Sequence, residues 1–288
     1  MNKKPFSSKI AALNPEKDHR EIAFLLTCHC FPWDMERALE FALFRTFAVP
    51  SISKILAGTG EFTARPRKRY DDTELILYEI LEHGMDSLRG KRAIHRMNDM
   101  HARFKISNGD FLYVLSTFIF EPIRWMDKYG WRPFTDLERQ SIYINYRRLG
   151  ERMQIRDIPN SLEEFEQFNK DYESRHFVFA QSNKLIGDKT VSLLLGFYLP
   201  KFLHGLGRPF VYALMDEPLR AAMGFPKPAG IFGAVVSSFL KLRARILRYF
   251  PERKEPLLGT KRRRPTYPEG YQIEELGTFA PLPSKREN

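Results

Sequence analysis

The segment Arg89–Phe104, with the sequence RGKRAIHRMNDMHARF, combines histidines with helical spacing of apolar residues. At 3.6 residues per turn, one helix face carries Ala93, Met97, Met100, His101 and Phe104. A second face carries Arg92, Arg96, Asp99 and Arg103. His95 is rotated by roughly 120° from His101 on the same geometry. The spacing therefore predicts one inward-facing histidine, His101, among apolar neighbours.

A neutral imidazole on an apolar helix face is a suitable ligand for a metal ion or for heme iron. Heme needs only one such proximal residue, because the porphyrin supplies four further nitrogens. The same pattern also fits a core histidine that makes one hydrogen bond. Both interpretations of His101 stay open on the residues alone.

Arg69 and Thr73 lie four residues apart, so in a helix they project from the same side. Together they present a cation and a hydroxyl group to bound oxygen or to a carboxylate such as a heme propionate. An ordinary helix N-terminus that follows a solvated basic loop has the same pattern.

The elements that must position these residues are helices throughout. Helix-period apolar patterns recur along the chain, and Thr135 and Ser161 each open a capping-box pattern. Pro122 predicts a kink or break in the apolar helix that starts at Phe111. We predict an N-terminal arm (residues 1–15), one all-α domain (residues 16–250) and a Pro-rich basic tail that is extended or disordered (residues 251–288).

The net charge of +11 is concentrated near the C-terminal end. Residues 241–264 hold ten basic and two acidic residues, so the rest of the chain is nearly balanced. Charge confined to one segment does not favour a nucleic-acid-binding groove. Cys28 and Cys30 lack the second ligand pair of a structural zinc site. With no secretory signal and no long apolar run, we expect an intracellular protein, cytoplasmic or peripheral on a membrane.

Two further functions fit a helical domain of this composition. A non-heme di-iron oxygenase needs two Glu-x-x-His motifs and two more glutamates, and only Glu173–His176 matches. A non-catalytic helical binding or membrane-surface protein is the other alternative. Residues 239–264 favour it, because apolar residues there share a helix with Lys and Arg, as in helices that lie on anionic membranes.

Four runs of the chain resemble the catalytic domain shared by the latex-clearing rubber oxygenases and MpaB-like oxygenases. They are GEFTARPRKRYDDT (60–73), AIHRMNDMHARFKISNGDFLYVLSTFIFEP (93–122), GWRPFTDLER (130–139) and GERMQIRDIP (150–159). The resemblance spans roughly residues 35–200 and is greatest to the MpaB-like members.

This resemblance implies a globin-like helical core, heme b, and an oxygenase acting with O2 on an apolar small molecule, with isoprenoids as one candidate class. It implies that His101 holds the iron and that Arg69 and Thr73 serve the oxygen side. Arg65 and Arg67, like Arg69, are candidates for contact with the heme propionates. The sequence departs from the rubber oxygenases at Asp72, where they have lysine.

Overall fold

The structure, a computed structural model, describes residues 4–279 and contains no β-strand within that range. The prediction of one all-α domain is confirmed. The larger helices are α2 (Pro15–Leu25), α3 (Pro32–Thr46), α4 (Pro50–Gly58), α6 (Pro66–His83), α7 (Leu88–His101), α8 (Asn108–Tyr129), α9 (Asp136–Arg152), α10 (Leu162–His176), α11 (Gln181–Leu195), α12 (His204–Leu214) and α14 (Gly230–Leu247). The shorter ones are α1 (Pro5–Ile10), η1 (Leu26–Cys30), α5 (Glu61–Ala64), η2 (Lys201–Leu203), α13 (Glu217–Ala222), η3 (Gly259–Lys261) and η4 (Ile273–Glu275).

Local sequence signals set most of the helix starts. The Thr135 side chain and the Glu138 carboxylate form the predicted capping box of α9, and Ser161 caps α10 through the backbone N–H of Glu164. Prolines stand in the first turn of several helices, where a missing N–H costs nothing. The break predicted at Pro122 is absent, because α8 continues through that residue as one helix.

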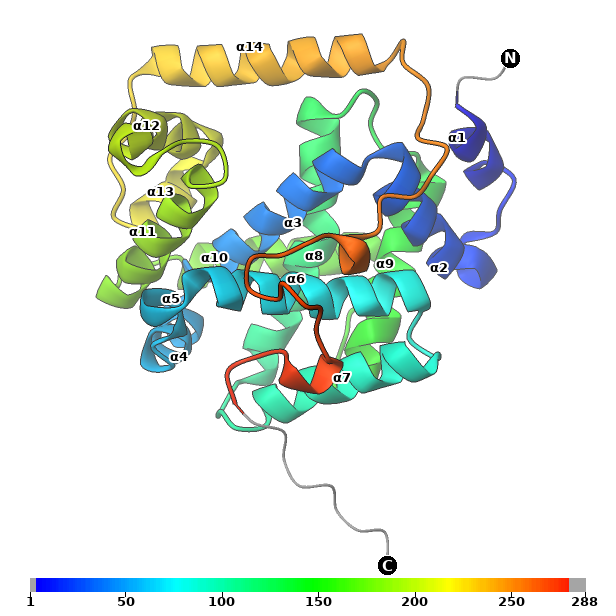
Figure 1. The fold of residues 1–288 in the computed structure, drawn as a ribbon, viewed down its shortest axis with the longest axis horizontal. Helices are drawn as coiled ribbons and strands as arrows, with labels where there is room; N and C mark the ends of the chain where they lie inside the picture. The colour runs from blue at the N-terminus through cyan, green and yellow to red at the C-terminus, as the bar shows by residue number, and fades with distance from the viewer. Residues whose placement is uncertain (1–3, 280–288) are drawn as a thin grey trace, which may run out of the picture.

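The core forms around α8, which contacts α3, α9, α10 and α14 (Figure 1). Its buried side chains meet those of α2 and α3 in one large apolar cluster that includes Phe31, Ile119 and Trp125. A second cluster joins the end of α3 to α11, α12 and α13. Helices α3, α8 and α9 also line the cavity described below.

Arg45 on α3 is buried at the junction of the two clusters and gathers three carboxylates. Its guanidinium pairs with both oxygens of Glu173, with Asp216, and with Glu121 at 3.5 Å. The hydroxyl of Tyr113 donates a further hydrogen bond to Glu173 at 3.1 Å. The arginine therefore neutralises acids from three other parts of the fold.

We expect Arg45→Met to lower the free energy of unfolding by about 3–5 kcal/mol, because it leaves buried carboxylates without their cation. The midpoint of urea denaturation measures this loss. The matched control is Arg139→Met, which removes an ion pair with Asp127 at the surface and should cost less than about 1 kcal/mol. Equal losses in both variants would contradict the structural role of Arg45.

Residues 251–279 differ from the predicted separate tail, because they lie against the helical body (Figure 1). After α14 this segment crosses α6 and reaches α7. The Glu252 carboxylate accepts hydrogen bonds from the backbone N–H groups of Phe6 and Ser7, and the backbone N–H of Leu257 donates to the carbonyl of Cys28 at 2.9 Å. The segment was predicted to be extended or disordered; its described part contains the short helices η3 and η4 and is held against the body by these contacts.

The basic residues of this segment meet acids of the body. Arg264 is buried and pairs with Asp71 and Glu74, while Arg262 pairs with Glu36. Much of the predicted basic patch is therefore used inside the fold. Arg96, which helical spacing placed on the face opposite the apolar one, is buried under this segment, and the backbone carbonyls of Leu276 and Phe279 accept hydrogen bonds from its guanidinium.

Within the described residues, no single helix has both the length and the apolar composition needed to cross a bilayer. Within the same residues, α3 and α4 taken together reach that length and composition, but the two helices are bent by 96° relative to each other.

Candidate active site

An apolar cavity of about 230 Å³ lies between α3, α4, α6, α7, α8 and α9. Most of its wall consists of Leu, Ile, Val, Met and Phe side chains. Polar or charged side chains enter the wall at Thr46, Thr59, Arg69, Asp72, Thr73, His101, Asp110, Tyr146 and Thr278. The cavity is thus suited to an apolar ligand, and a few polar groups in its wall can fix the orientation of that ligand.

His101 is the last residue of α7 and lines this cavity, as the helical spacing predicts. Its ring packs edge-on against Phe111 with centroids 5.4 Å apart, and its Nδ1 atom is buried without a hydrogen-bond partner among residues 4–279. Burial, and secondarily the charge of Arg69, lower the pKa of His101 to about 4. The imidazole is therefore neutral at physiological pH, and its Nδ1 atom makes no hydrogen bond within the described residues.

His95 has the opposite environment, which confirms its predicted orientation. Its side chain is 75% exposed and contacts Asp99 at 3.1 Å. Only His101 of the two is available to the cavity.

Arg69 and Thr73 also line the cavity, on α6. The Arg69 guanidinium donates to the Thr73 hydroxyl, which in turn donates to the Arg69 carbonyl at 3.1 Å. The guanidinium lies over the ring of Phe62, with 5.6 Å to the centroid. Burial lowers the pKa of Arg69, although guanidinium groups stay protonated in proteins.

No carboxylate of the described residues forms an ion pair with Arg69. The two acids that act on it electrostatically, Asp72 and Glu61, are bound by Lys68 and Arg65 instead. A buried cation without a counter-ion is costly unless a ligand compensates it. The cavity therefore presents an unpaired positive charge and a neutral imidazole to whatever it holds.

Arg65 and Arg67 do not line the cavity. Arg65 is half-exposed and pairs with Glu61, and Arg67 pairs with Asp71 at 2.9 Å. Their contact with propionates stays a prediction, and each already has a carboxylate partner within one turn.

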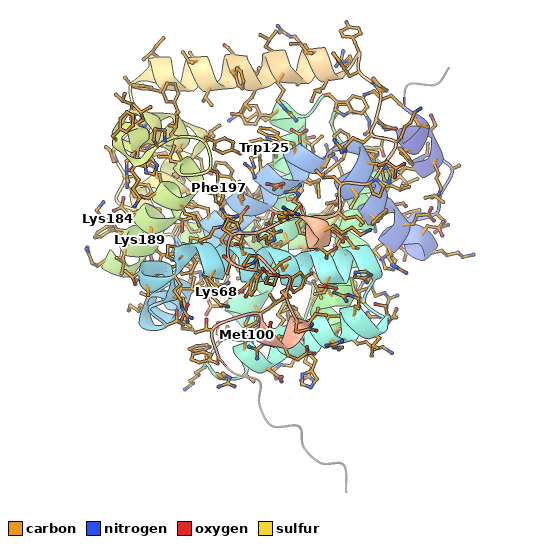
Figure 2. The ribbon with its side chains drawn as sticks, in the orientation of Figure 1. Lys68, Met100, Trp125, Lys184, Lys189 and Phe197 are labelled. Atoms are coloured by element: carbon orange, nitrogen blue, oxygen red, sulfur yellow. The ribbon has the colours of Figure 1, made fainter. Side chains whose placement is uncertain are left out.

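The sequence patterns missed one part of the wall, formed by Gly277, Thr278 and Phe279. Lys68 ties this segment to α6, since its ammonium donates to Asp72, to the Tyr267 hydroxyl and to the Gly277 carbonyl. Figure 2 shows Lys68 on α6 and Met100 beside the C-terminal segment. Nothing in the helical periodicity signals this contact, because the segment has none.

Gly277 allows this close approach. Its φ is +96°, which favours glycine, and a Cβ atom there would overlap the Met100 sulfur. We expect Gly277→Ala to cost about 1–3 kcal/mol more than Gly270→Ala, because it adds an overlap to the backbone strain. Gly270 has the same φ and open space around it. Urea denaturation of both variants measures the difference, and equal midpoints would contradict the contact with Met100.

The di-iron alternative has no support from the described part of the chain. No three His, Cys, Asp or Glu side chains there gather in a metal-binding arrangement. Glu173 is bound to Arg45, and the His176 Nδ1 atom lies 2.9 Å from the Tyr172 carbonyl.

Comparison with known proteins identifies a family and several relatives. Residues 36–238 match the family described as "ER-bound oxygenase mpaB/B′/Rubber oxygenase, catalytic domain". The chain is 34% identical over 238 residues to the ER-bound oxygenase mpaB′ of Penicillium brevicompactum, covering 76% of this chain and 56% of that protein. It is 34% identical over 212 residues to the ER-bound oxygenase mpaB of Penicillium roqueforti (strain FM164), covering 67% of this chain and 70% of the relative.

The chain thus spans little more than half the length of the first of these relatives. The match nevertheless covers most of the described helices, including those that carry His101, Arg69 and Thr73. By this match the chain belongs to the mpaB/B′ and rubber oxygenase catalytic-domain family.

Proposed function

We propose that this chain is a heme-dependent oxygenase that acts with O2 on an apolar small molecule, with isoprenoids as one candidate class. One observation carries the proposal: a neutral imidazole and a buried guanidinium without a counter-ion face the same apolar cavity. The printed names of the relatives, which are oxygenases, support the reaction class.

The residues present fit heme b in their donor chemistry. The His101 Nδ1 atom is buried and unpartnered, and the low pKa keeps the ring in the state that binds iron. The apolar wall suits the faces of a porphyrin. His101 would hold the iron, and the heme, when bound, supplies the activation of dioxygen.

Arg69 and Thr73 would act on the oxygen side. In a cavity that excludes water, a guanidinium stabilises developing negative charge on oxygen more strongly than it would in solution. The hydrogen bond from Arg69 to Thr73 restricts the guanidinium, so less motion is lost when it binds a ligand. The apolar wall would orient the substrate and exclude water.

Absorption spectroscopy and iron analysis of the full chain, purified from cells supplied with a heme precursor, test the proposal. A Soret band with one iron per chain supports it. A colourless, iron-free protein that stays colourless after incubation with hemin would reject it and favour the non-catalytic alternative. Two non-heme irons per chain would favour a di-iron enzyme.

The proposal includes contact with a membrane surface, as predicted from the apolar and basic residues of the range 239–264. The part of this range after residue 250 packs on the body, so the proposal concerns the exposed surface of α14 alone.

A further inference from the structure

Helix α14 has two apolar faces, and within residues 4–279 only one of them is buried against the rest of the chain. Leu240 and Ala244 are buried, and Val236 and Leu247 pack against the large apolar cluster. This face anchors α14 to the body next to α8. A helix on the surface of a soluble domain needs no second apolar face.

The second face consists of Ile231, Val235, Phe239, Leu242 and Ile246, here called the α14 surface. Each of these side chains is between 47% and 66% exposed. At 100° per residue they fall within about 80° of arc, so they form one stripe along the helix. Figure 1 shows α14 along one edge of the molecule.

Helix α12, which contacts α14, and the preceding η2 also carry exposed apolar residues. Phe202 is 82% exposed and Leu206 69% exposed, on η2 and at the start of α12. Helix α12 packs under α14, where the rings of Phe210 and Phe232 meet with centroids 5.0 Å apart. A row of exposed apolar side chains such as the α14 surface is typical of an interaction site.

The charge around the α14 surface has one sign. Residues 218–251 contain no Asp or Glu. Lys241 and Arg245 are exposed, and neither forms an ion pair within the described chain, whereas Arg243 is bound to Asp34. The stripe is therefore bordered by free cations.

We propose that the α14 surface lies on the face of an anionic lipid bilayer, with its apolar side chains among the acyl chains and with Lys241 and Arg245 at the headgroups. Free cations beside an apolar stripe complement such a surface. A second copy of the chain is disfavoured as the occupant. In a twofold dimer the same patch meets itself, which would place cations against cations with no acid between them.

Sedimentation of the full chain with lipid vesicles tests the proposal. We expect binding to vesicles of phosphatidylcholine mixed with phosphatidylserine, and weak binding to phosphatidylcholine alone. The variant Lys241→Gln/Arg245→Gln should partition about 25-fold more weakly, at about fivefold for each cation. Phe239→Asp/Leu242→Asp should lose binding, and the matched control Leu88→Asp, 75% exposed on α7, should retain it.

Circular dichroism verifies that each variant is folded. If one double variant is unstable, the other still tests the α14 surface. Binding that is equal for both vesicle types, or unchanged in both double variants, would overturn the proposal. So would a wild-type dimer in sedimentation velocity that Phe239→Asp/Leu242→Asp converts to monomer, because the surface would then belong to a second copy. The readout does not depend on heme, so its failure is distinguishable from failure of the oxygenase proposal.

Discussion

Protein carrying His101→Ala, purified from cells supplied with a heme precursor, is expected to show no Soret band and no bound iron. The expectation follows from the donors in the cavity. His101 is the only histidine in the described wall, and the wall contains no cysteine. The wall also contains the partly buried Tyr146, and burial raises the pKa of its phenol, which disfavours the phenolate form.

His95→Ala is the matched control, because it removes a histidine of the same helix from an exposed position. It should leave the spectrum unchanged. Imidazole added to His101→Gly should restore part of the Soret band by replacing the lost ligand. A wild-type spectrum in His101→Ala would contradict the assignment and move the iron ligand elsewhere.

Replacing Arg69 is expected to separate heme binding from oxygen chemistry. Arg69→Met should retain heme, because His101 is intact and methionine fits an apolar wall. Its reduced form should consume dioxygen about 10²- to 10³-fold more slowly, the loss typical of removing one preorganised donor. Stopped-flow absorption after mixing reduced protein with air-saturated buffer measures this rate.

Two further variants test whether a slower rate in Arg69→Met comes from the loss of the Arg69 guanidinium. Arg69→Lys keeps the charge without the planar fork and should recover part of the rate. Arg148→Met removes an exposed arginine on α9 and should have no effect. Loss of heme in Arg69→Met would show a structural role for Arg69 and contradict the proposed one. A gain in stability of Arg69→Met is also expected, because the variant removes a buried charge without a counter-ion.

Helical periodicity could predict the orientation of His101, since α7 is regular and Ala93, Ile94 and Met97 are buried on it. The same reasoning could not predict the burial of Arg96. An arginine on a charged face is expected in solvent, but the carbonyls of residues 276 and 279 cover it. That contact joins positions 180 residues apart and leaves no local signal.

The arginines at the start of α6 show a similar limit of prediction from sequence. Arg65, Arg67 and Arg69 are equivalent in residue type, and all three follow one basic run. Their different environments depend on Glu61 and Asp71, which pair with two of them, and on the turn of the helix that directs the third inward. The resemblance to a known family singled out Arg69, and the spacing alone did not.

The C-terminal part of the cavity wall has a consequence for the order in which the protein is made. Helices α3 to α9 contribute wall residues up to Ile155, and Gly277, Thr278 and Phe279 follow more than 120 residues later. During synthesis from the N-terminus, one side of the cavity stays open until that segment has left the ribosome.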